Sequence, residues 1–265
     1  MAKATGPSAP WNEIGLSEDP AVELLERFGY THVSAEDLDR ERASLLDVVL
    51  TTRLEAALKR LNPWLNDGNL QRAIREVTHV PAASLLDANE KLYTTLTRGI
   101  SVTQDLGHGS RGQQVRYFDF VAPRHNDLVV TRQLRIKGPK KHIIPDLVLY
   151  VNGVPLAVIE CKSPTIGEKW EHEAIDQLLR YQELAEKYRD LGAPRLFHSV
   201  QLCVATCLQD AVYGTVATPE RFYLRWKEPW PHELAAIEKQ LGRRATPQDV
   251  LFYGMLTPEA LLDLV

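Results

Sequence analysis

Residues 145–162 read PDLVLYVNGVPLAVIECK and determine what the rest of the chain is expected to be. Two apolar, β-branched runs flank Asn152-Gly153, a pattern typical of a β-hairpin with a tight turn. The charged residues stand only where the first run begins, as Asp146, and where the second ends, as Glu160 and Lys162. This stretch therefore predicts a buried hairpin that carries its charges at one end.

These three charged residues suggest a site for a hard cation. Side chains alternate between the faces of a strand, so Glu160 and Lys162 share one face and Cys161 points to the other. Two carboxylates suit Mg²⁺, and a neighbouring lysine could orient or deprotonate an attacking water. The alternative is that the carboxylates are strand-end charges reaching solvent, with Lys162 as their salt-bridge partner.

The register of the hairpin decides whether such a site can form. A plain two-residue loop would pair Val151 with Val154 and place Asp146 opposite Ile159, on the face away from Glu160. A shared site therefore requires either a three-residue loop, Val151-Asn152-Gly153, or a β-bulge that restores the parity.

At Pro145-Asp146 and Glu160-Cys161-Lys162 the chain resembles the PD-(D/E)xK nuclease superfamily. More specifically, the stretch resembles the nuclease region of the R (HsdR) subunit of type I restriction enzymes, where an Asn-Gly-x-Pro-Leu turn separates the same residues. Four other stretches agree: LNPWL at 61–65, FDFVAPRHNDLVVTRQ at 118–133, AIDQLLRYQ at 174–182, and AVYGTV with ERFYLRWK within 211–227. The likeness covers most of the chain after about residue 45.

The resemblance implies an α/β fold with a PD-(D/E)xK restriction-endonuclease-like core, in which helices flank a mixed central β-sheet and further helices are added at both ends. It implies a Mg²⁺-dependent DNA endonuclease. Asp146, Glu160 and the carbonyl of Cys161 would hold the metal, and Lys162 would position the water.

Two further features of the resembled family fall on predicted helices. Gln177 and Tyr181 match its QxxxY motif and would support the site or contact DNA, whereas the alternative is a buried Gln177 amide bonded to the sheet. Enzymes of the superfamily often carry another glutamate on an early helix, for which Glu18 is the candidate. The alternative for Glu18 is an ordinary solvated helix charge.

A basic segment leads directly into the predicted site. Between Leu128 and Pro145 there is no acidic residue, and the five cations there could neutralise DNA phosphates. These candidate DNA-binding residues are Arg132, Arg135, Lys137, Lys140 and Lys141.

Composition excludes several other classes of protein. The 265 residues are 44% hydrophobic and 25% charged with a net charge of −4, as in ordinary globular proteins and unlike a generally basic nucleic-acid coat. The sequence has no signal peptide, no apolar run of membrane-spanning length and only three cysteines, so a cytoplasmic protein is expected. It also lacks a phosphate-binding GxxxxGK[ST] loop for ATP.

The pattern of elements suggests four regions. Residues 1–16 are expected to be a flexible arm, 17–110 a mainly helical part packing on the core, 111–227 the nuclease core, and 228–265 helices leading to a motor region that this chain lacks. Strands are predicted at 114–121, 128–136, 146–151, 154–162, 199–205 and 221–226, and a long helix at 168–188.

If the resemblance holds in full, ATP acts only through the missing motor region. The partners would be double-stranded DNA and the modification and specificity subunits, with the isolated fragment monomeric and not bound to a membrane. The alternatives are a nuclease of another DNA-processing system, or a non-catalytic docking or DNA-binding module of the same fold.

Overall fold

A computed structural model describes residues 17–107 and 109–265, and the predicted arm at 1–16 lies outside them. In this part of the chain the main sheet has six strands in the order β1-β4-β7-β8-β9-β10. The β1/β4 and β8/β9 pairs are parallel and the other pairs antiparallel, which confirms a mixed central sheet. Its strands are β1 (Thr31–His32), β4 (Leu128–Arg132), β7 (Leu147–Val151), β8 (Val154–Cys161), β9 (Leu202–Thr206) and β10 (Ala211–Gly214).

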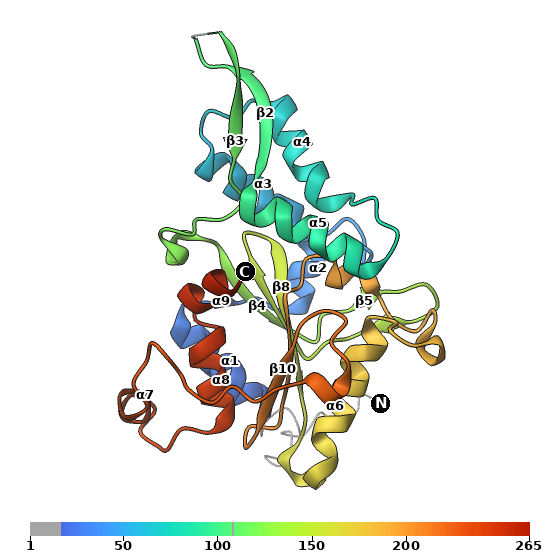
Figure 1. Cartoon of the computed structure of the whole chain (residues 1–265), viewed down its shortest axis with the longest axis vertical. Helices are drawn as coiled ribbons and strands as arrows, with labels where there is room; N and C mark the ends of the chain where they lie inside the picture. Colours follow the sequence, from blue (N-terminus) through green and yellow to red (C-terminus); the bar gives the residue numbers. More distant parts are fainter. Residues whose placement is uncertain (1–16, 108) are drawn as a thin grey trace, which may run out of the picture.

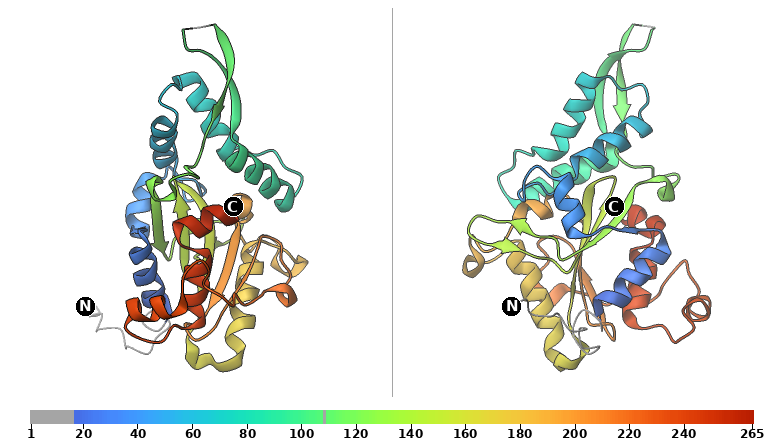
Figure 2. Two further views of the ribbon diagram at one scale, coloured as in Figure 1. Left: turned by 60° about the vertical axis from the view of Figure 1, so that its left-hand side comes forward. Right: turned by 180° about the vertical axis from the view of Figure 1, so that it is seen from behind.

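Helices cover both faces of this sheet (Figures 1 and 2). Every residue of β7 and β8 is buried, as expected for central strands enclosed on two sides. α6 (Trp170–Tyr181) packs on β8 and β9, whereas α8 (Pro247–Met255) packs against β10 and α1 (Asp19–Phe28). The mixed α/β fold flanked by helices is therefore confirmed.

The remaining helices lie around this core. α3 (Thr51–Leu61), α4 (Asp67–Thr78) and α5 (Leu85–Arg98) form a group of helices. The hairpin of β2 (Ile100–Asp105) and β3 (Ser110–Val115) projects from this group, well away from the main sheet (Figure 1). None of the described helices combines the length and the apolar character needed to cross a membrane. The other elements are α2 (Ala35–Glu41), α7 (Leu234–Leu241), α9 (Pro258–Leu264), β5 (Ile136–Lys137) and β6 (His142–Ile143).

A β-bulge in the hairpin of β7 and β8 places Asp146 and Glu160 on the same face of the sheet. Val151 pairs with Val154 across Asn152-Gly153, so the prediction of a three-residue loop is wrong. The pairing then shifts by one residue, because Tyr150 faces Pro155 whereas Leu149 faces Ala157. Proline has no N–H for the ladder, so an interruption beside Pro155 sacrifices little hydrogen bonding. The predicted alternative, a bulge, is confirmed.

The Asn-Gly turn is buried beneath the helices. Asn152 and Gly153 have φ values of 50° and 79°, as a two-residue hairpin turn requires. The Asn152 side chain accepts from the Asp127 N–H at 2.8 Å and donates to the Tyr117 carbonyl at 2.9 Å. Gly153 accepts a hydrogen bond from the Leu50 N–H at 2.8 Å, just before α3. The turn therefore joins the sheet to the helical part.

Replacing Gly153 by alanine should destabilise the protein strongly. A Cβ there would lie 2.4 Å from the Leu50 carbonyl oxygen, at a positive φ. Strain and clash together should lower the free energy of unfolding by about 3 kcal/mol. Gly242→Ala is the matched control, because Gly242 has φ +69° with no atom near the added Cβ. Urea unfolding that shows equal losses for both variants would contradict the close packing of the turn.

Two predicted strands have different limits. The prediction of one strand at 128–136 is wrong, because Gln133 has a φ of 52° and separates β4 from β5. The predicted strand at 114–121 instead ends at Val115, and its antiparallel partner, β2, was not anticipated.

The second half of the chain differs in a similar way. The long helix predicted at 168–188 is wrong, since α6 ends at Tyr181 and Glu183 has a φ of 57°. The peripheral strand predicted at 221–226 reduces to one bridge between Tyr213 and Leu224. Short 3-10 segments occupy Pro123–His125, Pro164–Lys169, Glu186–Tyr188, Pro194–His198 and Glu220–Phe222.

Candidate active site

The bulge brings the predicted carboxylates together at one end of the sheet. Because Leu147 pairs with Ile159, Asp146 and Glu160 stand opposite each other one step further along. Their exposed fractions are 8% and 0%, and that of Lys162 is 8%. The charges therefore do not reach solvent as the alternative supposed, although Lys162 does pair with Glu160 as that alternative also expected.

Backbone and side-chain contacts fix the three groups. The Cys161 N–H donates to Asp146 Oδ2 at 2.8 Å, which ties the start of β7 to the end of β8. Lys162 Nζ lies 3.5 Å from Glu160 Oε2, and the Lys162 N–H donates to the Thr206 carbonyl at 2.7 Å. Among the described residues, Glu160 Oε1 is buried without a hydrogen-bond partner.

The charge balance at this site favours a cation. Burial raises the pKa of Glu160 well above its usual range, the nearby Asp146 carboxylate raises it further, and Lys162 offsets only part of this. A divalent ion would reduce the repulsion between the carboxylates of Asp146 and Glu160, and it would give the buried Glu160 Oε1 a partner. The residues present thus fit Mg²⁺.

The described residues provide only part of a coordination shell. No three His, Cys, Asp or Glu side chains within 17–107 and 109–265 gather closely enough to hold an ion by themselves. Mg²⁺ commonly accepts one or two carboxylates and completes its shell with water and phosphate oxygens. The Cys161 thiol points to the face of β8 opposite Glu160, because successive side chains alternate across a strand.

Gln177 and Tyr181 lie beside the carboxylates. Gln177 Nε2 donates to the Tyr181 hydroxyl at 2.6 Å, so the alternative of an amide bonded to the sheet is wrong. The hydroxyl in turn donates to the Ile144 carbonyl at 3.1 Å, two residues before Asp146. Burial and then the charge of Glu160 raise the pKa of Tyr181. The motif therefore ties α6 to the chain that leads into the site.

Glu18, just before α1, also belongs to this group. It is buried rather than solvated, so the alternative of an ordinary helix charge is wrong. Glu18 Oε1 accepts from Gln133 Nε2 at 3.0 Å, and the same nitrogen donates to Asp146 Oδ1 at 2.9 Å. Sequence reasoning missed Gln133, because no local pattern marks it.

Some cations of the basic segment pair with acidic residues, and the others are exposed to solvent. Arg132 is held by two acids at the start of α1, with Nη2 3.3 Å from Glu18 and Nη1 2.8 Å from Asp19. Lys140 pairs with Asp190 at 2.6 Å. The exposed cations of the segment that form no ion pair with a described residue are Arg135, Lys137 and Lys141.

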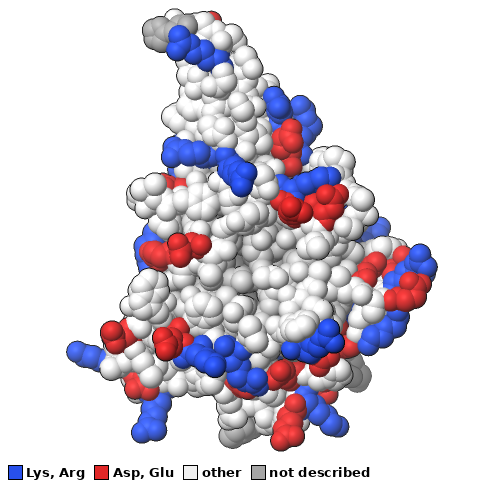
Figure 3. All heavy atoms as spheres, in the orientation of Figure 1, with Lys and Arg blue, Asp and Glu red and all other residues white. Residues whose placement is uncertain are grey.

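The surface charge is otherwise mixed. Lys and Arg are interspersed with Asp and Glu over the face shown in Figure 3, and no basic surface covers it. Contact with a polyanion would therefore depend on a local group of cations such as the segment after β4.

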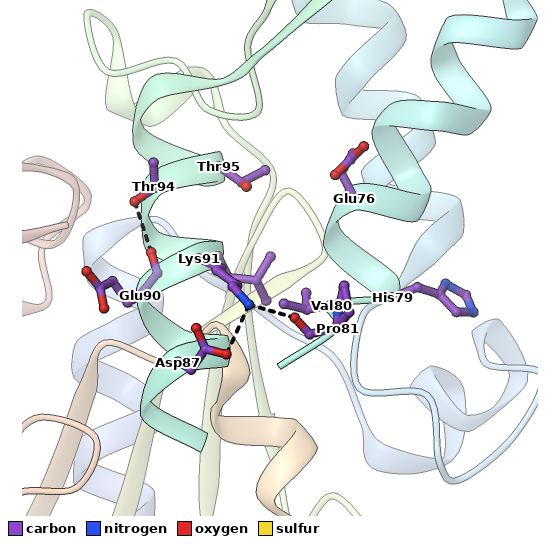
Figure 4. Close-up of a pocket in the computed structure, with 10 residues that line it drawn as sticks. Glu76, His79, Val80, Pro81, Asp87, Glu90, Lys91, Thr94 and Thr95 are labelled. Atoms are coloured by element: carbon purple, nitrogen blue, oxygen red, sulfur yellow. Dashed lines mark hydrogen bonds and ion pairs between the residues drawn. The ribbon is translucent and has the colours of Figure 1, made fainter. Parts of the chain in front are cut away.

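A cavity of about 540 Å³ between α4 and α5 lies elsewhere (Figure 4). On one side of it, Lys91 Nζ donates to the Pro81 carbonyl at 2.8 Å and to Asp87 at 3.0 Å. None of the predicted site residues lines this cavity. The carboxylates at the end of the sheet therefore remain the better candidate site.

The chain is similar to known proteins over most of its length. Residues 10–222 match the family described as the type I restriction enzyme R protein N terminus. The HindI endonuclease subunit of Haemophilus influenzae is 27% identical over 259 residues, which cover 94% of this chain and 23% of that protein. A subunit of Methanocaldococcus jannaschii, provisionally named the endonuclease subunit of type I enzyme MjaIXP, is 24% identical over 274 residues, covering 97% of this chain and 25% of its own. The chain thus spans about a quarter of the length of these relatives. Its match over most of its length shows that this chain belongs to the family of type I restriction enzyme R protein N-terminal regions.

Proposed function

We propose that this chain is the Mg²⁺-dependent endonuclease domain of a type I restriction enzyme R subunit, with a PD-(D/E)xK core that hydrolyses phosphodiester bonds in DNA. The observation that carries the proposal is the pair of opposed, buried carboxylates, Asp146 and Glu160, with Lys162 Nζ 3.5 Å from Glu160. The relatives, which are named as endonuclease subunits, support the same activity.

In this proposal Asp146, Glu160 and the Cys161 carbonyl would hold the metal. When bound, Mg²⁺ would offset the phosphate charge and make a coordinated water more acidic. Lys162 would orient the water by its ammonium group and stabilise the charge that develops on the phosphoryl oxygens. The water oxygen would bond to phosphorus as the bond from phosphorus to the sugar oxygen breaks, while the attacking water releases a proton to solvent and the departing sugar oxygen takes one from solvent.

The surrounding residues would hold this arrangement against the substrate. Gln177 and Tyr181 would keep α6 against the segment before Asp146. Tyr181 lies close enough to Glu160 for the charge of that carboxylate to raise the pKa of its hydroxyl. Arg135, Lys137 and Lys141 are exposed and could neutralise backbone phosphates.

The cleavage site on DNA would be chosen elsewhere in the enzyme. We assign ATP binding to a motor region outside this chain. The 265-residue sequence itself has no GxxxxGK[ST] loop for binding the phosphates of ATP. The modification and specificity subunits would complete a cytoplasmic complex acting on double-stranded DNA, as a type I site-specific deoxyribonuclease.

Crystals soaked in Mn²⁺ should show an anomalous scattering peak between Asp146 and Glu160. Mn²⁺ takes the oxygen ligands that suit Mg²⁺ and is easier to identify. The same soak of Glu160→Ala crystals is the control, since the opposed pair is then lost. A peak that survives this substitution, or none in the wild type, would refute the shared site.

The isolated 265-residue chain should bind DNA weakly and cut it poorly, because neither a motor nor a specificity subunit holds the substrate in place. If Arg135, Lys137 and Lys141 each neutralise one phosphate, log affinity should fall with log salt with a slope of about −3. Fluorescence anisotropy with a short duplex measures the slope. Replacing all three cations by glutamine should reduce it, and efficient ATP-independent cleavage would show that the division of labour is different.

A further inference from the structure

Gln133 links two buried carboxylates that come from distant parts of the chain. Its Nε2 lies 3.0 Å from Glu18 Oε1 and 2.9 Å from Asp146 Oδ1. A primary amide has two N–H donors and carboxylates only accept, so each hydrogen bond uses one of them. The side chain thereby joins the residue before α1 to the residue before β7.

The backbone of Gln133 adopts a conformation that glutamine rarely takes. Its φ is 52°, and its N–H donates to the Asp146 carbonyl at 3.0 Å. The pairing of β4 with β7 ends one residue earlier, at Arg132 and Leu147. The left-handed backbone of Gln133 turns the chain out of the sheet, and its side chain still contacts Asp146. Such strained residues persist where the surrounding contacts compensate for them, and they concentrate at functional sites.

Together these contacts fix the orientation of the Asp146 carboxylate. Oδ2 is held by the Cys161 N–H at 2.8 Å and Oδ1 by Gln133. Each carboxylate oxygen has two lone pairs, so both remain able to bind a cation. Groups that orient a ligand in this way commonly change metal affinity 10- to 100-fold when they are removed.

We propose that Gln133 is a positioning residue, which orients Asp146 for a divalent cation and couples it to Glu18. This role rests on the proposed function, because it assumes that Asp146 holds a metal. It adds a residue outside the resembled D…ExK and QxxxY motifs, and it gives Glu18 a defined connection to the site.

Gln133→Gly distinguishes the effect of losing the side chain from the effect of the left-handed backbone. Glycine adopts a φ of 52° without strain, so the chain should still fold cooperatively in EDTA, while the dissociation constant for Mn²⁺ should rise about 10- to 100-fold. Mn²⁺ titration followed by electron paramagnetic resonance measures this constant without any cleavage assay. Ala217→Gly is the matched control, because Ala217 also has a positive φ, 63°, and its side chain has no donor that could hold a carboxylate.

A second variant covers the case in which glycine disturbs the loop. Gln133→Asn keeps an amide and tolerates a left-handed backbone, but it is one methylene too short to reach both carboxylates, so Mn²⁺ binding should again weaken. The proposal is overturned if both variants bind Mn²⁺ like the wild type, or if Ala217→Gly weakens binding equally. If the wild type itself binds no Mn²⁺, the proposed function fails, and the positioning role fails with it.

Discussion

Asp146→Ala, Glu160→Ala and Lys162→Ala should each abolish DNA cleavage by the assembled enzyme, lowering it by about a thousandfold or more, while ATP-driven movement continues. Metal ligands and the group that orients the water act as a unit, so the loss of one removes most of the catalysis. Cleavage of supercoiled plasmid by the complete complex measures the effect, and ATP hydrolysis measured in the same samples reports on the motor.

Isosteric variants make this test sharper. Asp146→Asn and Glu160→Gln remove a charge without creating a cavity, and Lys162→Arg keeps a positive charge with a different shape. Glu186→Ala is the acidic control, because that carboxylate is exposed and pairs only with Arg189 in the described structure. Normal cleavage by Glu160→Gln would refute the nuclease assignment, as would a loss in Glu186→Ala of the same size.

The meeting of Asp146 and Glu160 was predictable from 18 consecutive residues, because strand periodicity leaves few choices. Alternation requires one extra residue in the hairpin if Asp146 and Glu160 are to meet. What the pattern leaves open is where this residue goes. The structure places the bulge next to Pro155. Because proline has no N–H for the strand ladder, the sequence itself already favoured an interruption of the pairing at this residue.

Gln133 was not predictable in the same way. Its role depends on a positive φ and on contacts with residues 13 and 115 positions away, neither of which leaves a local signature. The β2–β3 hairpin was missed for a related reason. Only Val102, Gln104 and Val115 of its strands are buried, so the apolar alternation that identifies a half-buried strand is weak.

The end of α6 shows how tertiary packing can override a helical pattern. Ala185 and Tyr188 continue its apolar spacing, which favoured a helix to 188. The helix nevertheless ends at Tyr181, whose carbonyl accepts the N–H of Ala193 from a returning loop. Gly192 fits there closely, since a Cβ would lie 2.4 Å from the Tyr181 carbonyl oxygen.

Without a divalent cation, the protein should lose stability as pH rises, and Glu160→Gln should remove most of that loss. Burial and the Asp146 charge raise the folded-state pKa of Glu160 above its ordinary value of 4.5. Below that value both states carry the proton, and the stabilising effect of the protonated acid is complete. As pH rises further, the unfolded state releases the proton first, so stability declines until the folded-state pKa has been passed.

The difference between the two proteins isolates Glu160 together with the groups that interact with it, because titrating groups remote from Glu160 contribute equally to both. In EDTA at about pH 8, Glu160→Gln should melt at least about 4 °C above the wild type, which is a resolvable shift for a domain of this size. Saturating Mg²⁺ should raise the wild-type melting temperature more than that of the variant, since the ion neutralises the carboxylates that oppose folding. If melting curves from about pH 5 to about pH 9 show the same slope for both proteins, the ionised Glu160 does not oppose folding, and relief of its repulsion cannot contribute to metal binding.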